Sequence, residues 1–330
     1  MRWLKIVVVL GVLLIFTSPL YPLTIKLGSP APEGSIWDKA LRNMAVEWKK
    51  ISKGKIRVKI YPGGIVGTEN DMIRKIRIGQ LQAGVFTSSG LSKISPEILA
   101  LSLPQFIKND DELKYILKKR VSELDQLYTK KGFKPLSWST AGWLYFFSKK
   151  PVVYPGDLKQ QTLAVSASDT STLQAWREIG FIAVPLALNN IMTGLQSGMV
   201  DVYFMTPLAS ATFQWFALAK NMCNLKIAPV MGNLLISQKT WKRVSEKIRP
   251  KLQKLTQRLM AEIESQSKTL EEKAISVMVD HGLTIHEVPA DAKDIWNRVV
   301  KKGHHAMIGE IVSKDLYLML QADLKEYRGR

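Results

Sequence analysis

The chain has very little cysteine and histidine. Its 330 residues include one cysteine, Cys223, and four histidines. A single thiol excludes a disulfide framework, and we expect this side chain to be a small buried hydrophobe. The histidines have no carboxylate or thiol partners at ligand spacing, so we expect them on the surface and predict no metal site. They are His281, His286, His304 and His305.

The sequence also lacks the motifs of common catalytic sites. It contains no nucleophile elbow, no phosphate-cradling loop and no recognisable Ser-His-Asp or Cys-His arrangement. It therefore predicts neither an enzyme nor a bound cofactor.

The apolar run near the start of the chain is too short to cross a membrane. Ile6–Phe16 has eleven residues, against the ~20 that a spanning helix needs. Arg2 and Lys5 precede it and Thr17 follows, which is the pattern of an export signal. We therefore assign residues 1–22 to a signal peptide, with an uncleaved anchor as the alternative.

Negative charge is scarce. Lys and Arg number 47 against 28 Asp and Glu, which gives a net charge of +19. The basic residues are spread over several segments without zinc-ligand spacing or an aromatic RNA-binding signature, which argues against a nucleic-acid partner. Solvated helix faces near an anionic membrane surface explain the charge more simply.

What the chain does contain is an alternation of strands and helices that begins after the signal. Its length predicts about two domains. Apolar residues recur at helical spacing from Trp37 to Trp48, and Asn70 or Asp71 can cap a second helix that Gly79 closes. Strands are predicted at Leu23–Leu27, Lys55–Tyr61 and Ala83–Thr87. This order indicates an α/β lobe with parallel pairing.

The helix–strand pattern then repeats. Ile73–Thr87 reads IRKIRIGQLQAGVFT and Met192–Thr206 reads MTGLQSGMVDVYFMT, with Gly79 aligned on Gly198. The offset is 119 residues, far longer than the ~20–50 of a solenoid. The repeat suggests two lobes built on one plan.

A long helix is predicted in the C-terminal third of the chain. Ser245–His281 is almost continuously compatible with a helix of roughly 45 Å, longer than one lobe is wide. A strand at Leu283–Val288 and helices at Ala290–Lys302 and Met307–Tyr327 follow.

Four stretches in this order resemble the DctP-like extracytoplasmic substrate-binding proteins of TRAP transporters. They are residues 60–91 (IYPGGIVGTENDMIRKIRIGQLQAGVFTSSGL), 96–107 (PEILALSLPQFI), 146–159 (FFSKKPVVYPGDLK) and 181–210 (FIAVPLALNNIMTGLQSGMVDVYFMTPLAS). The resemblance implies an α/β fold of two lobes joined by hinge strands, with a long helix spanning both and a ligand between them. We expect residues 23–141 and 230–270 in the first lobe, and 142–229 and 271–330 in the second.

Charge of either sign is nearly absent from residues 160–219. At the chain average of 23% these sixty residues would hold about fourteen charged side chains, but they hold four. Those four are Asp169, Arg177, Glu178 and Asp201. Family members that bind organic acids hold the carboxylate with arginines, and the resemblance places Ala164 and Leu144 at two of those positions. Thr206 falls near the place of a family asparagine.

The missing arginines predict an apolar ligand. A bidentate arginine lets a dry cleft accept a carboxylate, whose burial would otherwise cost several kcal/mol. Whether Arg177 turns into the cleft is left open. We expect ligand contacts from residues around the two replaced positions and from the end of the first lobe's strand. They are Leu144, Ala164, Thr206, Trp143, Tyr145, Ser166, Tyr203, Phe204, Met205, Thr87, Ser88 and Ser89.

The resemblance thus implies a periplasmic binding protein that closes on a hydrophobic or weakly polar ligand and delivers it to TRAP membrane permease subunits. The alternative is a periplasmic carrier or chaperone that passes a lipid-like molecule to a tetratricopeptide-repeat protein.

Overall fold

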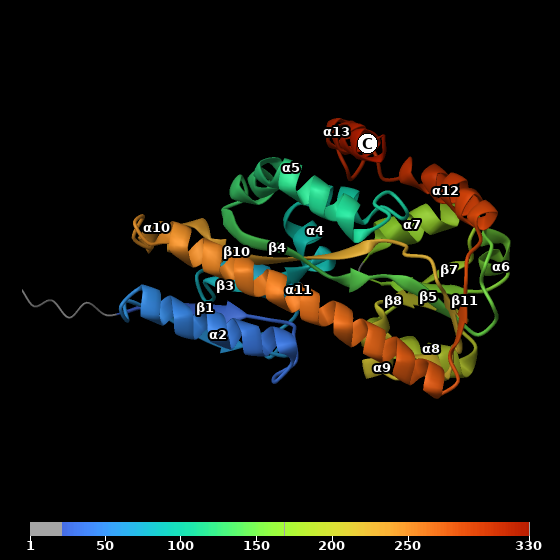
Figure 1. Ribbon diagram of the computed structural model, residues 1–330, viewed down its shortest axis with the longest axis horizontal. Helices are drawn as coiled ribbons and strands as arrows, with labels where there is room; N and C mark the ends of the chain where they lie inside the picture. Colours follow the sequence, from blue (N-terminus) through green and yellow to red (C-terminus); the bar gives the residue numbers. More distant parts are fainter. Residues whose placement is uncertain (1–21, 168, 330) are drawn as a thin grey trace, which may run out of the picture.

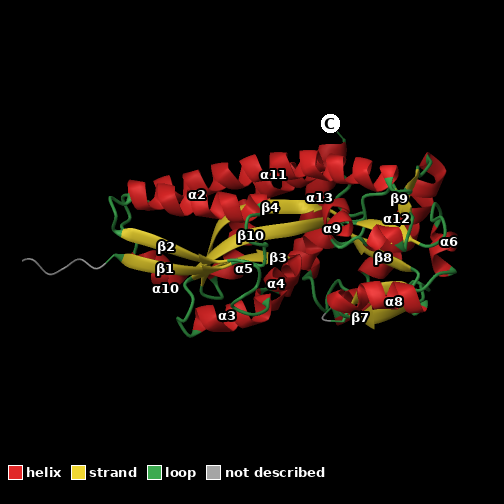
Figure 2. Ribbon diagram, turned by 90° about the horizontal axis from the view of Figure 1, so that it is seen from below, coloured by secondary structure: helices red, strands yellow, loops and turns green. Residues whose placement is uncertain are grey.

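The computed structural model describes residues 22–167 and 169–329. The signal or anchor predicted for residues 1–22 lies outside this part of the chain, apart from Pro22. The molecule is elongated, with two α/β lobes end to end and one long helix running along both (Figures 1 and 2). None of the helices in the described residues combines the length and the apolar character of a membrane span.

Lobe I is built on a five-stranded sheet of order β2-β1-β3-β10-β4. The strands are β1 (Leu23–Gly28), β2 (Ile56–Tyr61), β3 (Ala83–Thr87), β4 (Phe133–Trp143) and β10 (Pro229–Ser237). β1 is parallel to β2 and β3, as the sequence predicts, and β10 runs antiparallel to β3 and β4.

Helices cover both faces of this sheet because its strands alternate apolar side chains between them. One face carries α2 (Ile36–Ile51) and the long helix α11 (Arg249–Asp280). The other carries α3 (Glu69–Arg77), α4 (Ser88–Ile94), the 3₁₀ helix η1 (Pro96–Ser102) and α5 (Asp110–Thr129). α10 (Gln238–Arg243) lies at the far end of the lobe (Figure 1).

Lobe II is built on a six-stranded sheet of order β11-β9-β5-β8-β6-β7. The strands are β5 (Tyr145–Ser148), β6 (Leu163–Ser166), β7 (Ala183–Leu186), β8 (Val202–Met205), β9 (Asn221–Cys223) and β11 (Thr284–His286). The helices are α6 (Pro155–Lys159), α7 (Thr170–Glu178), η2 (Leu188–Asn190), α8 (Ile191–Ser197), α9 (Pro207–Thr212), η3 (Trp215–Ala217) and α12 (Ala290–His304). Cys223 is buried, as expected, and burial raises the pKa of its thiol to about 12.

The lobes are joined by two strand crossings and by α11. β4 continues into β5, and β9 leads into β10. At the crossing Leu144 donates its backbone N–H to Ala228 O (2.9 Å), and Ile227 donates to Leu144 O (2.8 Å). α11 has 32 residues, or about 48 Å at 1.5 Å per residue, and it packs on β4, on α2 and on α9 of lobe II. The prediction of a long helix spanning both lobes is confirmed.

The internal repeat takes the same form in both lobes. α3 and β3 correspond to α8 and β8, and the intervening Gly79 and Gly198 have left-handed backbones with φ of 80° and 77°. One detail of the prediction is wrong. The N-cap of α3 is Thr68, whose hydroxyl accepts the Asp71 N–H, while the Asp71 carboxylate accepts the Thr68 N–H.

The C-terminal helix begins later than predicted and lies beside lobe I. α13 (Lys314–Arg328) starts after the N-cap Ser313, because residues 307–313 form a turn with a bridge between Ile308 and Val312. The helix packs against α5 and η1. The division of residues 23–330 between the lobes remains a prediction.

Candidate functional site

A cavity of about 120 Å³ opens in lobe II at the carboxyl ends of three parallel strands, β6, β7 and β8. Open α/β sheets present their ligand crevices at this edge. The cavity wall consists mainly of apolar and aromatic side chains. They are Ala164, Val165, Ser166, Asp169, Leu186, Leu188, Ile191, Tyr203, Phe204, Met205 and Trp215.

Aromatic packing fixes the back of this cavity. Tyr203 stacks on Phe147 with ring centroids 5.2 Å apart and shares a 2.6 Å hydrogen bond between its hydroxyl and that of Ser210. Trp215 meets Tyr203 edge to face at 5.4 Å. Because Ala164 extends no further than its Cβ, this buried position leaves the space in front of the rings open.

The rim of the cavity is apolar as well. Leu188 is on its wall and is 53% exposed. Phe213 is 44% exposed and stacks on the Trp215 ring at 4.7 Å. Apolar side chains that remain in water around a recess are typical of ligand sites.

The cavity wall carries no cation. Asp169 is its one carboxylate, which accepts the Thr172 N–H (3.0 Å) as the N-cap of α7. Arg177 does not turn into the cavity. Its Nε donates to Ala183 O (2.8 Å) at the start of β7, which is the end of the strand opposite to the cavity.

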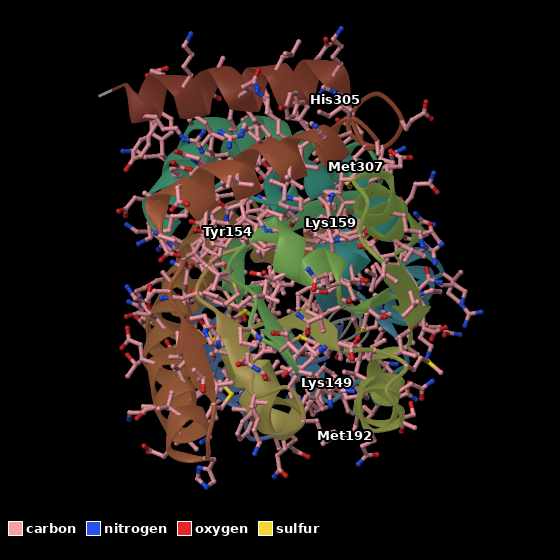
Figure 3. All side chains as sticks on the ribbon, turned by 90° about the vertical axis from the view of Figure 1, so that its right-hand side faces the viewer. Lys149, Tyr154, Lys159, Met192, His305 and Met307 are labelled. Atoms are coloured by element: carbon pink, nitrogen blue, oxygen red, sulfur yellow. The ribbon has the colours of Figure 1, made fainter. Side chains whose placement is uncertain are left out.

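The other cations of lobe II near these strands also face away. Lys149 lies 3.7 Å from Asp201, which precedes β8, so it too is at the opposite end of the strands. Figure 3 looks at the end of lobe II and shows Lys149 and Lys159 on that outer face. Lys159 lies 5.5 Å from the centroid of the Phe181 ring.

In lobe I, Thr87, Ser88 and Ser89 lie at the carboxyl end of β3 and the start of α4. The Glu69 carboxylate holds this turn by accepting the Thr87 N–H (2.5 Å) and hydroxyl (2.9 Å). Burial raises the pKa of Glu69, and the hydrogen bonds from Thr87 oppose the rise. Ser88 accepts the Met231 N–H (2.8 Å), whereas Ser89 is exposed.

The structure brings together some of the predicted site residues and separates others. Ala164, Ser166, Tyr203, Phe204 and Met205 line the cavity. The others lie elsewhere.

Leu144 and Thr206 stand apart from the cavity wall. The side chain of Leu144 packs on the core of lobe II. Thr206 is buried and caps α9 through its hydroxyl, which accepts the Ala209 N–H (3.4 Å).

Trp143 and Tyr145 lie in the hinge. Trp143 Nε1 donates to Asp110 Oδ1 (2.6 Å), and Lys226 Nζ lies 4.9 Å from the Trp143 ring centroid and 3.3 Å from Asp110 Oδ2. Burial, together with the charges of Glu271 and Asp110, raises the pKa of Tyr145.

Sequence reasoning missed six cavity residues, which are Val165, Asp169, Leu186, Leu188, Ile191 and Trp215. Leu186, Leu188 and Ile191 come from the segment that joins β7 to α8. One feature could have identified them. This segment directly follows β7, a strand that is parallel to β6 and ends at the same edge of the sheet.

Two lobes, a hinge of crossing strands and a crevice at the strand ends define a protein of the solute-binding class. The chain belongs to the DctP family, described as bacterial extracellular solute-binding protein, family 7, which it matches over residues 27–310.

Curated relatives of the chain have similar names. The solute-binding protein RD1_1052 of Roseobacter denitrificans is 25% identical over 229 residues, 68% of this chain and 69% of the relative. The sialic acid-binding periplasmic protein SiaP of Vibrio cholerae is 21% identical over 264 residues, 79% of this chain and 82% of the relative.

Solved structures share the fold. A TRAP periplasmic solute-binding protein from Ochrobactrum anthropi has a TM-score of 0.84 at 20% identity, covering 94% of this chain and 97% of that one. One from Xanthobacter autotrophicus, with bound galacturonate, has a TM-score of 0.79 at 20% identity, covering 90% and 99%. The predicted fold and family are therefore confirmed. Proteins of this family are periplasmic substrate-binding components of TRAP transporters, which work with membrane subunits, and are not enzymes.

Proposed function

We propose that this TRAP solute-binding protein takes a hydrophobic or weakly polar small molecule into the lobe II cavity and closes lobe I over it. The loaded protein then delivers the molecule to the membrane permease subunits. The observation that carries the proposal is the composition of the cavity wall, which is apolar and aromatic and has no Lys or Arg.

Electrostatics disfavour an acid in this cavity. Enclosing a carboxylate without a charged partner costs several kcal/mol, and Asp169 on the wall would add repulsion. Burial of apolar ligand surface contributes about 25 cal/mol per Å². An apolar ligand therefore gains free energy here where an acid loses it.

Similar proteins have been solved with acids, among them galacturonate, D-glucuronate and succinate. The family resemblance implies an arginine in acid-binding members on the strand that is β6 here. This chain has Ala164 at that place, on the cavity wall. We propose that this chain binds a hydrophobic or weakly polar ligand where those relatives bind acids, because Ala164 has a methyl group in place of the arginine's cation.

Closure would bring the end of β3 in lobe I toward the cavity. Thr87, Ser88 and Ser89 are the first residues available there, and hydroxyl groups suit a weakly polar ligand. A ligand that contacts both lobes stabilises the closed state, because only that state offers the second set of contacts.

Native purification followed by solvent extraction and mass spectrometry tests the proposal. We expect an apolar or weakly polar molecule near one per protein. A dicarboxylate or sugar acid bound in stoichiometric amount would contradict it.

The Ala164→Arg variant gives a second test, with the neutral fluorescent probe N-phenyl-1-naphthylamine as ligand. We expect at least tenfold weaker binding of this probe, because the arginine fills the cavity and charges it. Circular dichroism and thermal unfolding establish that the variant is folded. Unchanged affinity in a folded variant would place the ligand elsewhere. No feature of the described residues favours the alternative carrier role with a tetratricopeptide-repeat partner, and we do not propose it.

A further inference from the structure

A second and larger cavity, of about 450 Å³, lies at the far end of lobe I. It forms where the end of α3, the turn into β4 and the helix α10 meet. Gln82 is on its wall and precedes β3, whereas Thr87 ends β3 at the edge of lobe I that would close over the lobe II cavity. The two sites are therefore separated by at least the length of this strand, about 16 Å.

Four cationic side chains surround this cavity. They are Arg77, Lys131, Lys239 and Arg243. No carboxylate lines it, and within residues 22–167 and 169–329 none of the four side chains makes an ion pair or hydrogen bond with the protein. Like charges that converge on a recess without counter-charges produce a focused positive potential.

Helix electrostatics account for only part of this arrangement. Arg77 and Arg243 are in the last turns of α3 and α10, where a cation is favourable. Lys239 is in the first turn of α10, where a cation is unfavourable. Lys239 also shares the cavity with three other cations, and their mutual repulsion raises the free energy of the empty site. A bound anion would offset this repulsion.

The floor of the cavity is apolar. Phe133 is buried beneath it, and Ile78 is on its wall with 65% of its surface exposed. Cations above an apolar floor suit a ligand with an anionic head and an uncharged body.

We propose that this cavity binds a phosphate group, carried by a soluble phosphate ester or by the headgroup of an anionic phospholipid. Arg77 and Arg243 supply planar forks of donors that match phosphate oxygens, and the two lysines add mobile point charges.

The position of the site is compatible with either source. β1 and β3 are parallel and Ala83 pairs with Leu27, so β1 starts four residues further toward the end of the lobe that holds the cavity. Residues 1–22, predicted to be an export signal or an anchor, join the chain at this end. A retained anchor would hold the cavity close to lipid headgroups.

The test compares two double variants of the full chain that remove the same charge from neighbouring positions. Lys131→Gln with Arg243→Gln changes the cavity wall. Lys130→Gln with Lys242→Gln changes exposed residues one position away that are not on the wall. Calorimetry with glycerol 3-phosphate in low-salt buffer measures the soluble source. Flotation with phosphatidylglycerol vesicles, against phosphatidylcholine vesicles, measures the lipid source.

We expect the cavity variant to bind glycerol 3-phosphate at least tenfold more weakly than the wild type, and the control variant to bind it with unchanged affinity. A parallel loss on phosphatidylglycerol vesicles identifies the headgroup as a source, and unchanged flotation identifies the soluble ester alone. Equal affinities in both variants, or no saturable binding of either probe to the wild type, would overturn the proposal. Thermal unfolding and binding of N-phenyl-1-naphthylamine show that the fold and the ligand crevice are intact.

Discussion

The carboxylate of Glu271, on α11, lies against the backbone of Gly142 at the hinge end of β4. A Cβ at position 142 would come 2.9 Å from Glu271 Cδ and would overlap one carboxylate oxygen. Gly142 also has a φ of 107°, a conformation that favours glycine. The contact between strand and long helix at the hinge therefore depends on the absence of a side chain at this residue.

We expect Gly142→Ala to lower the free energy of unfolding by more than about 2 kcal/mol, because backbone strain and steric overlap add. Gly54→Ala is the control. Gly54 has a φ of 80° with open space around the added methyl group, so it should cost about 1 kcal/mol. Urea unfolding measures both, and equal costs would show that Glu271 moves aside without penalty.

A double variant separates the two contributions. Glu271→Ala removes the overlapping atoms but leaves the backbone conformation of residue 142 unchanged. Gly142→Ala should therefore cost less in the Glu271→Ala background than in the wild type, by about 1 kcal/mol or more. If Gly142→Ala costs the same free energy in both backgrounds, the whole effect of the substitution comes from backbone strain.

Glu271 also predicts a pH dependence of stability. Burial raises its pKa from 4.5 to about 7, with Lys226 opposing the rise and Asp110 adding to it, and its Oε1 is buried without a hydrogen-bond partner. Since the folded protein holds this proton more tightly than the unfolded chain, the contribution of Glu271 to stability falls between about pH 4.5 and 7 and stays low above that range.

We therefore expect Glu271→Gln to be more stable than the wild type at pH 8, by on the order of 3 kcal/mol, and similar to it near pH 4.5. Thermal unfolding of both proteins across this pH range gives the difference in their stability. The other titrating groups are the same in both proteins, so their contributions cancel in this difference. A difference that does not vary with pH would show that Glu271 ionises normally in the folded protein.

Part of the regular structure of both lobes was accessible to sequence reasoning because its signals are local, whereas β4, β10 and α5 were not predicted. The repeat of Ile73–Thr87 in Met192–Thr206 identifies a helix, a left-handed glycine and a strand, all within fifteen residues. The cavity residues on β6 and β8 were predicted from the family resemblance, and the positions of the strand ends support them. A strand places its last residues at one edge of the sheet whatever the rest of the chain does.

Contacts between distant segments were not accessible in this way. Glu69 is the first residue of α3, and its carboxylate accepts hydrogen bonds from Thr87, eighteen residues away. His304 was expected on the surface, yet it is buried with Nε2 2.8 Å from Pro104 O, and burial lowers its pKa to about 4. Both depend on how helices pack, which no short pattern encodes.

Ion pairs that attach α13 to α5 are a further non-local feature with a measurable effect. Asp323 has a side chain only 4% exposed and accepts from Arg120 (2.5 and 2.9 Å), with Lys119 Nζ 2.8 Å away. The hydrogen bond from Arg120 holds the pKa of Asp323 below its usual range. Its stabilising contribution is thus present above about pH 4 and is lost as the pH falls through the folded-state pKa.

Asp323→Asn should destabilise the protein by about 1.5–3 kcal/mol at pH 7, because Arg120 and Lys119 lose a buried partner. Glu326→Gln is the control, since its side chain is 48% exposed and its bridge to Lys119 should contribute less than about 1 kcal/mol. Urea unfolding compares the two, and a smaller cost for Asp323→Asn would mean that α13 is held mainly by its apolar contacts.

Two exposed hydrophobic residues at opposite ends of β7 provide a matched test of the ligand crevice. Leu188 and Ile182 are both 53% exposed, so truncation of either leaves the core intact. Leu188 lies on the cavity wall, whereas Ile182 precedes the other end of the strand. We expect Leu188→Ala to weaken binding of N-phenyl-1-naphthylamine about three- to tenfold, because roughly 1 kcal/mol of ligand-covered apolar surface is removed. Ile182→Ala should leave the affinity unchanged. Fluorescence titration measures both constants, and equal effects of the two variants would mean that the probe binds outside this cavity.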